Sequence, residues 1–308
     1  MTTRRTLLTA AAALPLAAPA ILRATGARAQ GDDAPATGPL AHRTRPFAIG
    51  GLTVTPLLSG AAVRDDPHSI FGLNVDDATF EEVSAEARIP ADAAQFFFTP
   101  TLVEDGTNVI LFDTGLDPTG MTAALEAAGR APGDVTHVAI THMHPDHIGG
   151  LSQDGTPTFE NAEHLAGATE MAAWEEDPSD AFTAKVLPIR DRFTLIEPGA
   201  AVGPAEAVEA FGHTPGHMAF RVADGDAAML LIADTANHPI WSLEHPDWEV
   251  LFDMDKAAAA ATRRELLGMA AADGTPILGY HMPFPAVGYV EEAGDGFRWI
   301  PHSYQLFL

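Results

Sequence analysis

The chain has 308 residues, no cysteine and a formal net charge of −25 at pH 7. The absence of cysteine excludes disulfide bonds and thiolate metal ligands, so any metal must bind to His, Asp or Glu. An acidic surface repels phosphate backbones, which argues against nucleic acid as a partner. Because 46% of the residues are hydrophobic, the chain can build a large core.

The first 29 residues have the layout of a secretory signal. Arg4 and Arg5 precede an apolar run from Leu7 to Leu22, and Ala27-Arg28-Ala29 forms a small-x-small cleavage site. Twin arginines are typical of the route that exports folded proteins, so we expect a periplasmic or secreted protein. A retained anchor is the alternative, although the run is shorter than the ~20 residues that span a bilayer. The sequence does not decide whether the leader is cleaved.

Residues 30–46 are rich in Pro, Gly and Ala and are interpreted as a flexible tether, followed by one domain over residues 47–308. The predicted strands are, in chain order, 47–49, 52–55, 96–103, 108–113, 135–141, one near residue 164, 206–211, 217–223, 228–233, 275–279, 287–292 and 296–300. The predicted helices cover residues 77–87, 119–129, 168–176 and 255–272. Hairpins dominate this order, which favours mixed sheets with helices outside over a doubly wound parallel sheet.

Four candidate metal ligands fall within six residues after the predicted strand 135–141. They are His142, His144, Asp146 and His147. Neutral imidazole and carboxylate are ligands that Zn²⁺ favours. Gly149-Gly150 suits a loop, and a loop that follows a buried strand is a usual place for chemistry. A solvated polar turn is the alternative interpretation of this stretch.

Three later segments share one pattern, in which an apolar strand is followed or preceded by a residue that can bind a metal. The first segment, 211–217, holds His213 and His217; the second ends at Asp234 and the third at His281. Each strand can deliver its terminal residue to a common rim. The sequence therefore predicts that these side chains meet the 142–147 cluster.

In this order, the motifs resemble the metallo-β-lactamase superfamily over about residues 47–300. The resemblance implies an α/β fold, a four-layer αββα sandwich of two mixed sheets with helices on both outer faces. It implies two metal sites: His142, His144 and His217 at the first, Asp146, His147 and His281 at the second, and Asp234 bridging both. It further implies that Asp113 supports the ligand loop from behind. His213 would either donate an orienting hydrogen bond or serve as a plain turn residue.

The resemblance also implies an activity, that of a metal-dependent hydrolase acting on ester bonds. Two divalent ions, most favourably Zn²⁺, would lower the pKa of a bridging water to about 7. The resulting hydroxide would attack the ester-type electrophile, with Asp234 and Asp146 as the catalytic carboxylates. Manganese, cobalt and iron remain open, because this donor set suits several borderline cations.

Within the superfamily, the best resemblance is to the methyl parathion hydrolase-like branch. The leader, the Pro-rich segment His281–Pro285 and the position of His238, four residues after Asp234, fit that branch. The residues directly after Asp234 are Thr235-Ala236-Asn237-His238, without the tyrosine that many quorum-quenching lactonases carry shortly after the bridging aspartate. The implied substrates are small organophosphate triesters, lactones or related esters. No stable membrane span is expected after cleavage, and the oligomeric state is open, with a homodimer the usual form in related enzymes.

Aromatic residues are expected to line an apolar pocket. The candidates are Phe96, Phe98, Trp174, Phe182, His238 and Phe284. Successive residues on a strand face opposite sides, so we expect only one or two of the aromatic residues at the pocket. Two alternatives stay open: a non-catalytic exported protein that binds metal or ligand on the same fold, and a β-lactamase or thioesterase-type hydrolase.

Overall fold

The computed structural model describes residues 43–302. The predicted leader (1–29) and residues 30–42 of the predicted tether lie outside these residues. Within the described range, no helix combines the length and apolarity needed to cross a bilayer.

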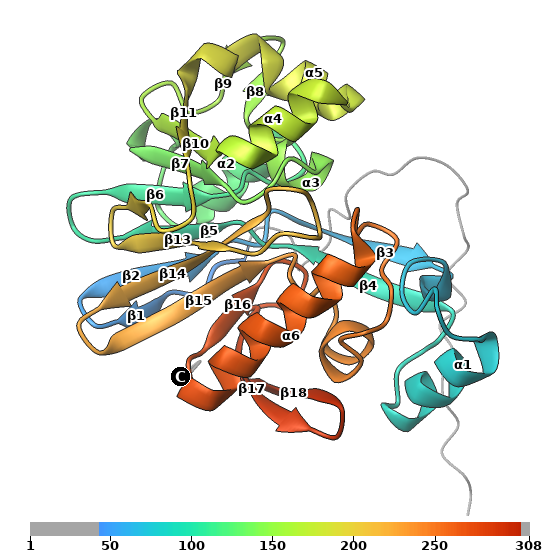
Figure 1. The fold of residues 1–308 in the computed structure, drawn as a ribbon. Coiled ribbons are helices and arrows are strands. Elements are labelled where there is room, and N and C mark those ends of the chain that lie inside the picture. Colours follow the sequence, from blue (N-terminus) through green and yellow to red (C-terminus); the bar gives the residue numbers. More distant parts are fainter. Residues whose placement is uncertain (1–42, 303–308) are drawn as a thin grey trace, which may run out of the picture. The chain divides into compact units, whose positions relative to one another are not determined.

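Two mixed sheets of seven strands form the centre of the fold (Figure 1). In spatial order, the first sheet contains β1 (Phe47–Ile49), β2 (Leu52–Pro56), β5 (Thr101–Glu104), β6 (Val109–Phe112), β7 (His137–Ile140), β10 (Glu163–Gly167) and β11 (Phe193–Ile196). The second contains β12 (Ala201–Val202), β13 (Ala205–Glu209), β14 (Met218–Asp224), β15 (Ala227–Ala233), β16 (Ile277–Gly279), β17 (Val287–Ala293) and β18 (Gly296–Pro301). Parallel pairing is confined to β6–β7–β10–β11 and to β15–β16.

The sheets pack face to face, and helices cover their outer faces. Phe112 of β6 lies 4.8 Å from Phe220 of β14, measured between ring centroids, within one core shared by both sheets. The outer face of the first sheet packs against α2 (Pro118–Ala127), α4 (Ala168–Glu176) and α5 (Asp180–Lys185). Leu266 and Leu267 of α6 (Lys256–Asp273) join the core on the other side. The predicted αββα sandwich is confirmed.

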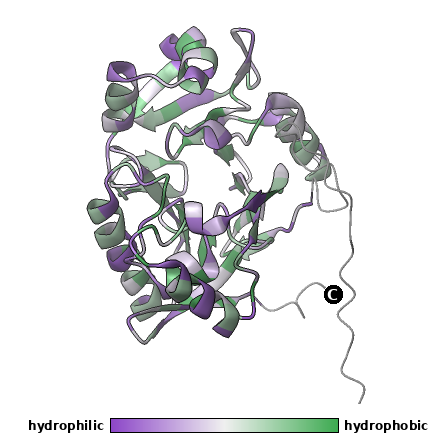
Figure 2. Ribbon diagram, turned by 90° about the vertical axis from the view of Figure 1, so that its right-hand side faces the viewer, coloured by the Kyte–Doolittle hydropathy of each residue, from purple (hydrophilic) through white to green (hydrophobic). Residues whose placement is uncertain are grey.

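Polarity follows this layering. Figure 2 shows apolar residues concentrated on the central strands, while the outer helices carry both apolar and polar residues. The longest helix of the described residues, α6, begins where the sequence predicts, because the Asp255 side chain accepts a hydrogen bond from Ala258 N (3.0 Å). It ends at Gly274, whose φ of 63° is the left-handed conformation that glycine adopts without strain.

The predicted strand 96–103 is wrong in one respect, because the structure divides it into two strands that belong to different sheets. β4 (Ala93–Phe98) ends before Thr99-Pro100, and β5 begins after them. Pro100 has no N–H and cannot continue the ladder. β4 pairs instead with β3 (Gly60–Asp65), a strand that the sequence did not predict, in a separate two-stranded antiparallel sheet.

This two-stranded sheet and α1 (Asp77–Glu86) enclose a third, aromatic cluster beside the main core. Trp241 stacks on Phe80 with 5.0 Å between ring centroids, and both are almost fully buried. Trp241 lies in a π-helix over Pro239–Glu244. Smaller elements complete the described chain: α3 (Pro145–Ile148), the hairpin β8 (Ser152–Gln153) and β9 (Thr156–Pro157), and 3-10 turns at Pro67–Ser69, Pro132–Asp134 and Leu187–Arg192.

Candidate metal centre

The sheet order brings the predicted ligands together. Asp113 and His142 follow β6 and β7, which are parallel neighbours, so both residues leave the first sheet at the same edge. Asp234 and His281 follow β15 and β16, the parallel pair of the second sheet. The carboxyl ends of parallel strands share an edge, and in an α/β fold ligands bind there.

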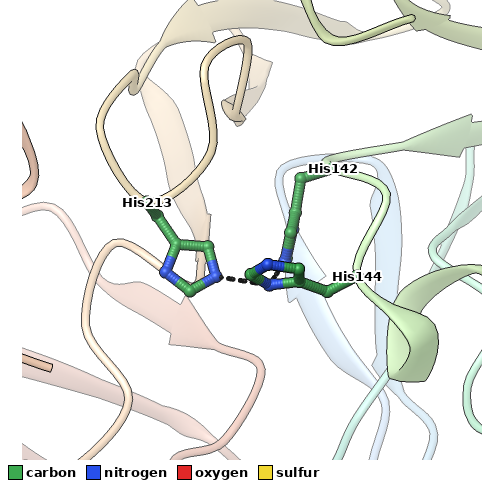
Figure 3. Close-up of side chains that lie close together, drawn as sticks. All are labelled: His142, His144 and His213. Carbon is green, nitrogen blue, oxygen red and sulfur yellow. Dashed lines mark hydrogen bonds between the residues drawn. The ribbon is translucent and has the colours of Figure 1, made fainter. Parts of the chain in front are cut away.

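A first group of side chains contains three imidazole rings, those of His142, His144 and His213 (Figure 3). Nδ1 of His144 lies 3.1 Å from His142 Nε2 and 2.9 Å from His213 Nε2. Asp234 Oδ2 lies 3.4 Å from His213 Nε2. Ring nitrogens that converge in this way repel one another unless a proton or a cation lies between them, so the group suits a divalent cation.

The structure corrects the expected roles of His213 and His217. The Nδ1 atom of His217 lies 3.0 Å from Ala210 O, and its Nε2 accepts a hydrogen bond from the backbone N–H of Asp234 (3.2 Å). Both ring nitrogens are therefore used by the backbone, and His217 belongs to none of the candidate ligand groups among the described residues. His213 takes the place expected for His217, while His217 fixes the backbone of Asp234.

A second group contains Asp146, His147 and His281. Oδ2 of Asp146 lies 3.3 Å from His281 Nε2 and 3.5 Å from His147 Nε2. Asp234 lies between the two groups, since its Oδ1 is 3.2 Å from His147 Nε2 and its Oδ2 is 3.2 Å from His281 Nε2. The structure therefore brings these four predicted residues together at one place.

Two buried polar atoms at this centre lack a hydrogen-bond partner. His147 Nε2 and Asp234 Oδ1 face each other, and neither makes a hydrogen bond of good geometry. Buried polar atoms normally have partners, because a buried group without one destabilises the fold by about 1–3 kcal/mol. Imidazole nitrogens and carboxylate oxygens are the donor set of divalent zinc sites. The residues therefore fit the metal ions that the sequence implied.

Buried carboxylates fix the loops that carry the ligands. Asp113 accepts hydrogen bonds from Thr141 N (2.8 Å) and from the Thr141 hydroxyl (2.9 Å), and its Oδ2 lies 2.8 Å from His147 Nδ1. This is the supporting position expected from the sequence. Asp113 is 2% exposed, and burial raises the pKa of its carboxyl, although His147 opposes that effect.

Glu170 on α4, which the sequence analysis missed, joins the two ligand loops. Its Oε1 accepts hydrogen bonds from Met143 N (2.9 Å) and Trp174 Nε1 (2.7 Å). Its Oε2 accepts from the Thr214 hydroxyl (2.7 Å) and from Gly216 N (2.9 Å). A single buried carboxylate thus holds the 142–147 and 213–217 loops together, and a lone Glu in a helix carries no sequence signal for that role.

Two rings of the first group, those of His142 and His144, are neutral at pH 7. Burial, and then His147, lowers the pKa of His142 well below its ordinary value of 6.5. Burial, and then His213, lowers the pKa of His144 to about 3. Neutral imidazole is the form that binds a cation, so these side chains need no proton release to do so.

The carboxylates of the second group are ionised. Burial would raise the pKa of Asp234, but His281 and His147 hold it well below its ordinary value of 3.8. Burial acts in the same direction on Asp146, whose pKa is nevertheless held at about 2, chiefly by His147. Burial would lower the pKa of His281, yet the Asp234 carboxylate raises it to about 10. The two carboxylates therefore favour positive charge beside them, as the raised pKa values of His281 and His147 reflect.

The ligand loops touch neighbouring backbone without room for a side chain. A β-carbon at Gly150 would lie 2.1 Å from Thr114 O, and one at Gly216 would lie 2.1 Å from Glu170 N. These distances are far below van der Waals contact, so only glycine fits at either position. Backbone packing therefore fixes the loops in addition to the buried carboxylates.

A cavity of about 310 Å³ opens onto both groups. Its lining residues are Arg64, Phe96, Phe98, Leu116, His144, Pro145, Asp146, Asp234, Phe252 and His281. Phe96 and Phe98 lie on one face of β4, with ring centroids 5.5 and 5.6 Å from that of His281. These two match the predicted wall, whereas Arg64, Leu116 and Phe252 were not foreseen.

The other predicted wall residues lie elsewhere. The Trp174 N–H is bonded to Glu170, and its ring packs edge-on behind His144. Phe182 is fully buried beneath the first sheet. His238 caps the π-helix by accepting from Ile240 N and Trp241 N, and its ring stacks on Trp241. Phe284 is half-buried and does not contribute to the lining of the cavity.

The fold and the centre agree with a family comparison. The model of the metallo-beta-lactamase superfamily matches residues 99–281, a range that contains every member of both ligand groups. The chain therefore belongs to the metallo-beta-lactamase superfamily.

Two curated relatives share part of the sequence. YobT of Bacillus subtilis (strain 168) is 27% identical over 128 residues, which cover 39% of this chain and 54% of YobT. Hydroxyacylglutathione hydrolase of Rhodospirillum rubrum is 33% identical over 124 residues, covering 39% of this chain and 41% of that enzyme. The matched part spans about half or less of the length of either relative.

Solved structures show the same fold. AidC, a dizinc quorum-quenching lactonase in complex with a product, N-hexnoyl-L-homoserine, superposes with a TM-score of 0.78 at 22% identity, covering 85% of this chain and 98% of AidC. The hydrolase AbOPH of the beta-lactamase superfamily superposes with a TM-score of 0.78 at 24% identity and the same coverage. A probable metal-dependent hydrolase from Staphylococcus aureus gives a TM-score of 0.69 at 17% identity, covering 83% and 99%.

Proposed function

We propose that this protein hydrolyses an ester-type bond in a small molecule with two divalent metal ions, most favourably Zn²⁺. His142, His144 and His213 would hold one ion, Asp146, His147 and His281 the other, and Asp234 would be shared by both. The observation that carries this proposal is the pair His147 Nε2 and Asp234 Oδ1, buried and 3.2 Å apart without a hydrogen bond. A cation between the groups would satisfy both atoms.

Divalent ions in such a centre activate water near neutral pH and polarise the bond to be broken. The protein's own side chains hold the ligand residues in position. Asp234 is 3% exposed and is fixed by His217 through its backbone and by Asn237, whose Nδ2 donates to Oδ2 (2.9 Å). The Asp146 side chain is 21% exposed and lines the cavity, so its carboxylate faces both the second metal position and a bound substrate.

The cavity supports a substrate that combines an ester centre with an apolar group. Phe96, Phe98, Leu116 and Phe252 give it an apolar wall next to the ligands. Its volume of about 310 Å³ is at the lower end of the range for small-molecule sites. The lactonase neighbour AidC favours lactones as the first choice. Organophosphate triesters, suggested by the resemblance to the methyl parathion hydrolase-like branch, are the second.

Metal analysis and a substrate panel test the proposal together. Purified protein should contain two equivalents of zinc or a similar metal by elemental analysis. It should open an N-acyl-L-homoserine lactone or cleave paraoxon faster than nitrocefin or an acyl thioester. A chelator should abolish turnover, and added Zn²⁺ should restore it. Metal-loaded protein that leaves both the lactone and the triester intact would contradict the proposal and favour a binding role.

Export by the twin-arginine route is part of the same proposal. Its support is the sequence layout of residues 1–29, with Arg4-Arg5 ahead of the apolar run. Fractionation of cells that express the full chain should place the protein in the periplasm. Arg4→Lys/Arg5→Lys should keep it in the cytoplasm, and unchanged export of that variant would contradict the route.

A further inference from the structure

Besides Asp113 and Glu170, another buried carboxylate, that of Asp253, lies behind the first ligand group. Asp253 lies between the π-helix and α6, and it is 2% exposed. Its Oδ1 is 2.8 Å from Nδ1 of His213, and its Oδ2 accepts a hydrogen bond from Arg263 (2.9 Å). Arg263 is itself 1% exposed. An ion pair buried to this degree is costly unless its geometry is well satisfied.

The geometry decides which nitrogen of His213 carries the proton. A carboxylate paired with a guanidinium is ionised and can only accept hydrogen bonds. The Nδ1 of His213 must therefore donate to Asp253, which leaves the lone pair on Nε2. That Nε2 faces His144 Nδ1 at 2.9 Å and Asp234 Oδ2 at 3.4 Å, in the middle of the first group.

Arg263 connects this arrangement to the shared carboxylate. Besides Asp253, its guanidinium donates to Thr235 O (2.8 Å) and to Pro246 O (2.7 Å). Thr235 directly follows Asp234. One buried arginine on α6 therefore fixes both the partner of His213 and the strand end that carries Asp234.

We propose that Asp253 is the positioning residue of the first metal site, setting the tautomer and orientation of His213, and that Arg263 holds Asp253 in place. The assignment rests on the proposed function only in placing a cation at the first ligand group. Carboxylates in this position behind a metal-binding histidine typically change metal affinity by 10–100-fold when removed.

The same segment forms part of the cavity mouth. Phe252 lines the cavity and is 41% exposed, while Met254 on the other side of Asp253 is 59% exposed. Met254 N donates to His213 O, and Asp255 N donates to Gly212 O, both at 2.9 Å. A displacement of Phe252 and Met254 would therefore also displace His213, which couples the entrance of the cavity to the first ligand group.

The test compares two Asp–Arg pairs whose arginines are neighbours on α6. Asp253→Asn removes the carboxylate behind His213, and the control Asp247→Asn breaks the exposed pair with Arg264, one residue along α6. Competition with a chromophoric chelator gives the Zn²⁺ affinity of each site, and Co²⁺ absorption reports the ligand geometry. We expect one of two metals to bind Asp253→Asn about 10–100-fold more weakly with an altered Co²⁺ spectrum. Asp247→Asn should match the wild type in both measurements.

A second variant covers the case in which Asp253→Asn does not fold. Asp253→Glu keeps the charge opposite Arg263 but displaces the oxygens, so it should fold and show a smaller loss at the same site. Folded Asp253→Asn or Asp253→Glu with wild-type affinity at both metals would overturn the proposal, as would a wild-type protein that binds no metal. If the wild type binds two metals but cleaves no ester, the proposed function fails while the role of Asp253 is still decided by the affinities.

Discussion

In both ligand groups a buried carboxylate orients one histidine, but the residues that hold the carboxylate differ. Each contains one histidine whose Nδ1 faces a buried carboxylate at 2.8 Å: His213 with Asp253, and His147 with Asp113. Asp113 is satisfied by the neutral donors of Thr141, whereas Asp253 is paired with the charged Arg263. The orientation of the histidine in the second group therefore depends on adjacent strand ends. In the first group it depends on a buried ion pair whose carboxylate lies 40 residues further along the chain.

The largest effect should come from the residue that both groups share. Asp234→Ala removes an anion that faces His147 and His281 and should release both metals, reducing turnover to the level without enzyme. Elemental analysis and the ester panel measure this loss. Asp226→Ala, the same substitution at an exposed residue just before the other end of β15, is the matched control. Two tightly held metals in Asp234→Ala would remove the basis for treating the groups as one centre.

The two histidines of the 213–217 loop test the corrected ligand assignment. His213→Ala should lose one metal equivalent and turnover by more than the 10–100-fold typical of a supporting residue. His217→Ala should retain both equivalents and lose turnover only within that range, because it removes a hydrogen bond to the Asp234 backbone. Metal content and kcat/KM separate the two variants. The reverse order would restore the expectation from the sequence.

Asp113→Asn and Asp253→Asn should each weaken the binding of a different metal ion. The first removes the carboxylate behind His147, so we expect a 10–100-fold loss of affinity at the second position with the first unchanged. Co²⁺ titrations of both variants, read by absorption, would show two distinct residual spectra. Identical residual spectra would mean that the groups are coupled too tightly to be treated separately.

A histidine outside both groups gives the smallest predicted effect and a reference for their pH response. Burial, and then Arg192, lowers the pKa of His164 to about 4 from 6.5. The unfolded chain takes up this proton below about pH 6.5, whereas the folded chain does not, so stability is lost as the pH falls from 6.5 towards 4. The loss at pH 5.5 should be about 1 kcal/mol.

Chemical denaturation of metal-free protein at pH 7.5 and 5.5 measures this contribution. His164→Gln should lose about 1 kcal/mol less than the wild type over the same interval. An unchanged difference between the two pH values would show that His164 is not the group responsible.

The sequence was sufficient where the chemistry restricts residue type within a short distance. His142, His144, Asp146 and His147 follow one strand, so their convergence required no knowledge of distant packing. The choice between His213 and His217 could not be made in this way. Both follow the same strand four residues apart, and only the positions of Ala210 O and Asp234 N show which ring turns away from the centre.

The cavity wall and the supporting residues depend on tertiary contacts. Trp174 and Phe182 are aromatic residues in the expected region, yet they pack beneath the first sheet rather than at the cavity. Glu170 and Asp253 are single acidic residues whose partners come from distant loops, so neither has a local pattern. β3 was missed because its outer half, with the pattern Val63-Arg64-Asp65, lacks the apolar alternation of a half-buried strand.

The glycine contacts at the ligand loops have a consequence for engineering. At Gly150 and Gly216, main chain abuts main chain, so mutational libraries that include these positions would consist largely of misfolded members. The wall built by β3, β4 and Phe252 carries ordinary side chains that tolerate exchange. Directed evolution towards new substrates should therefore diversify that wall and leave the glycines untouched.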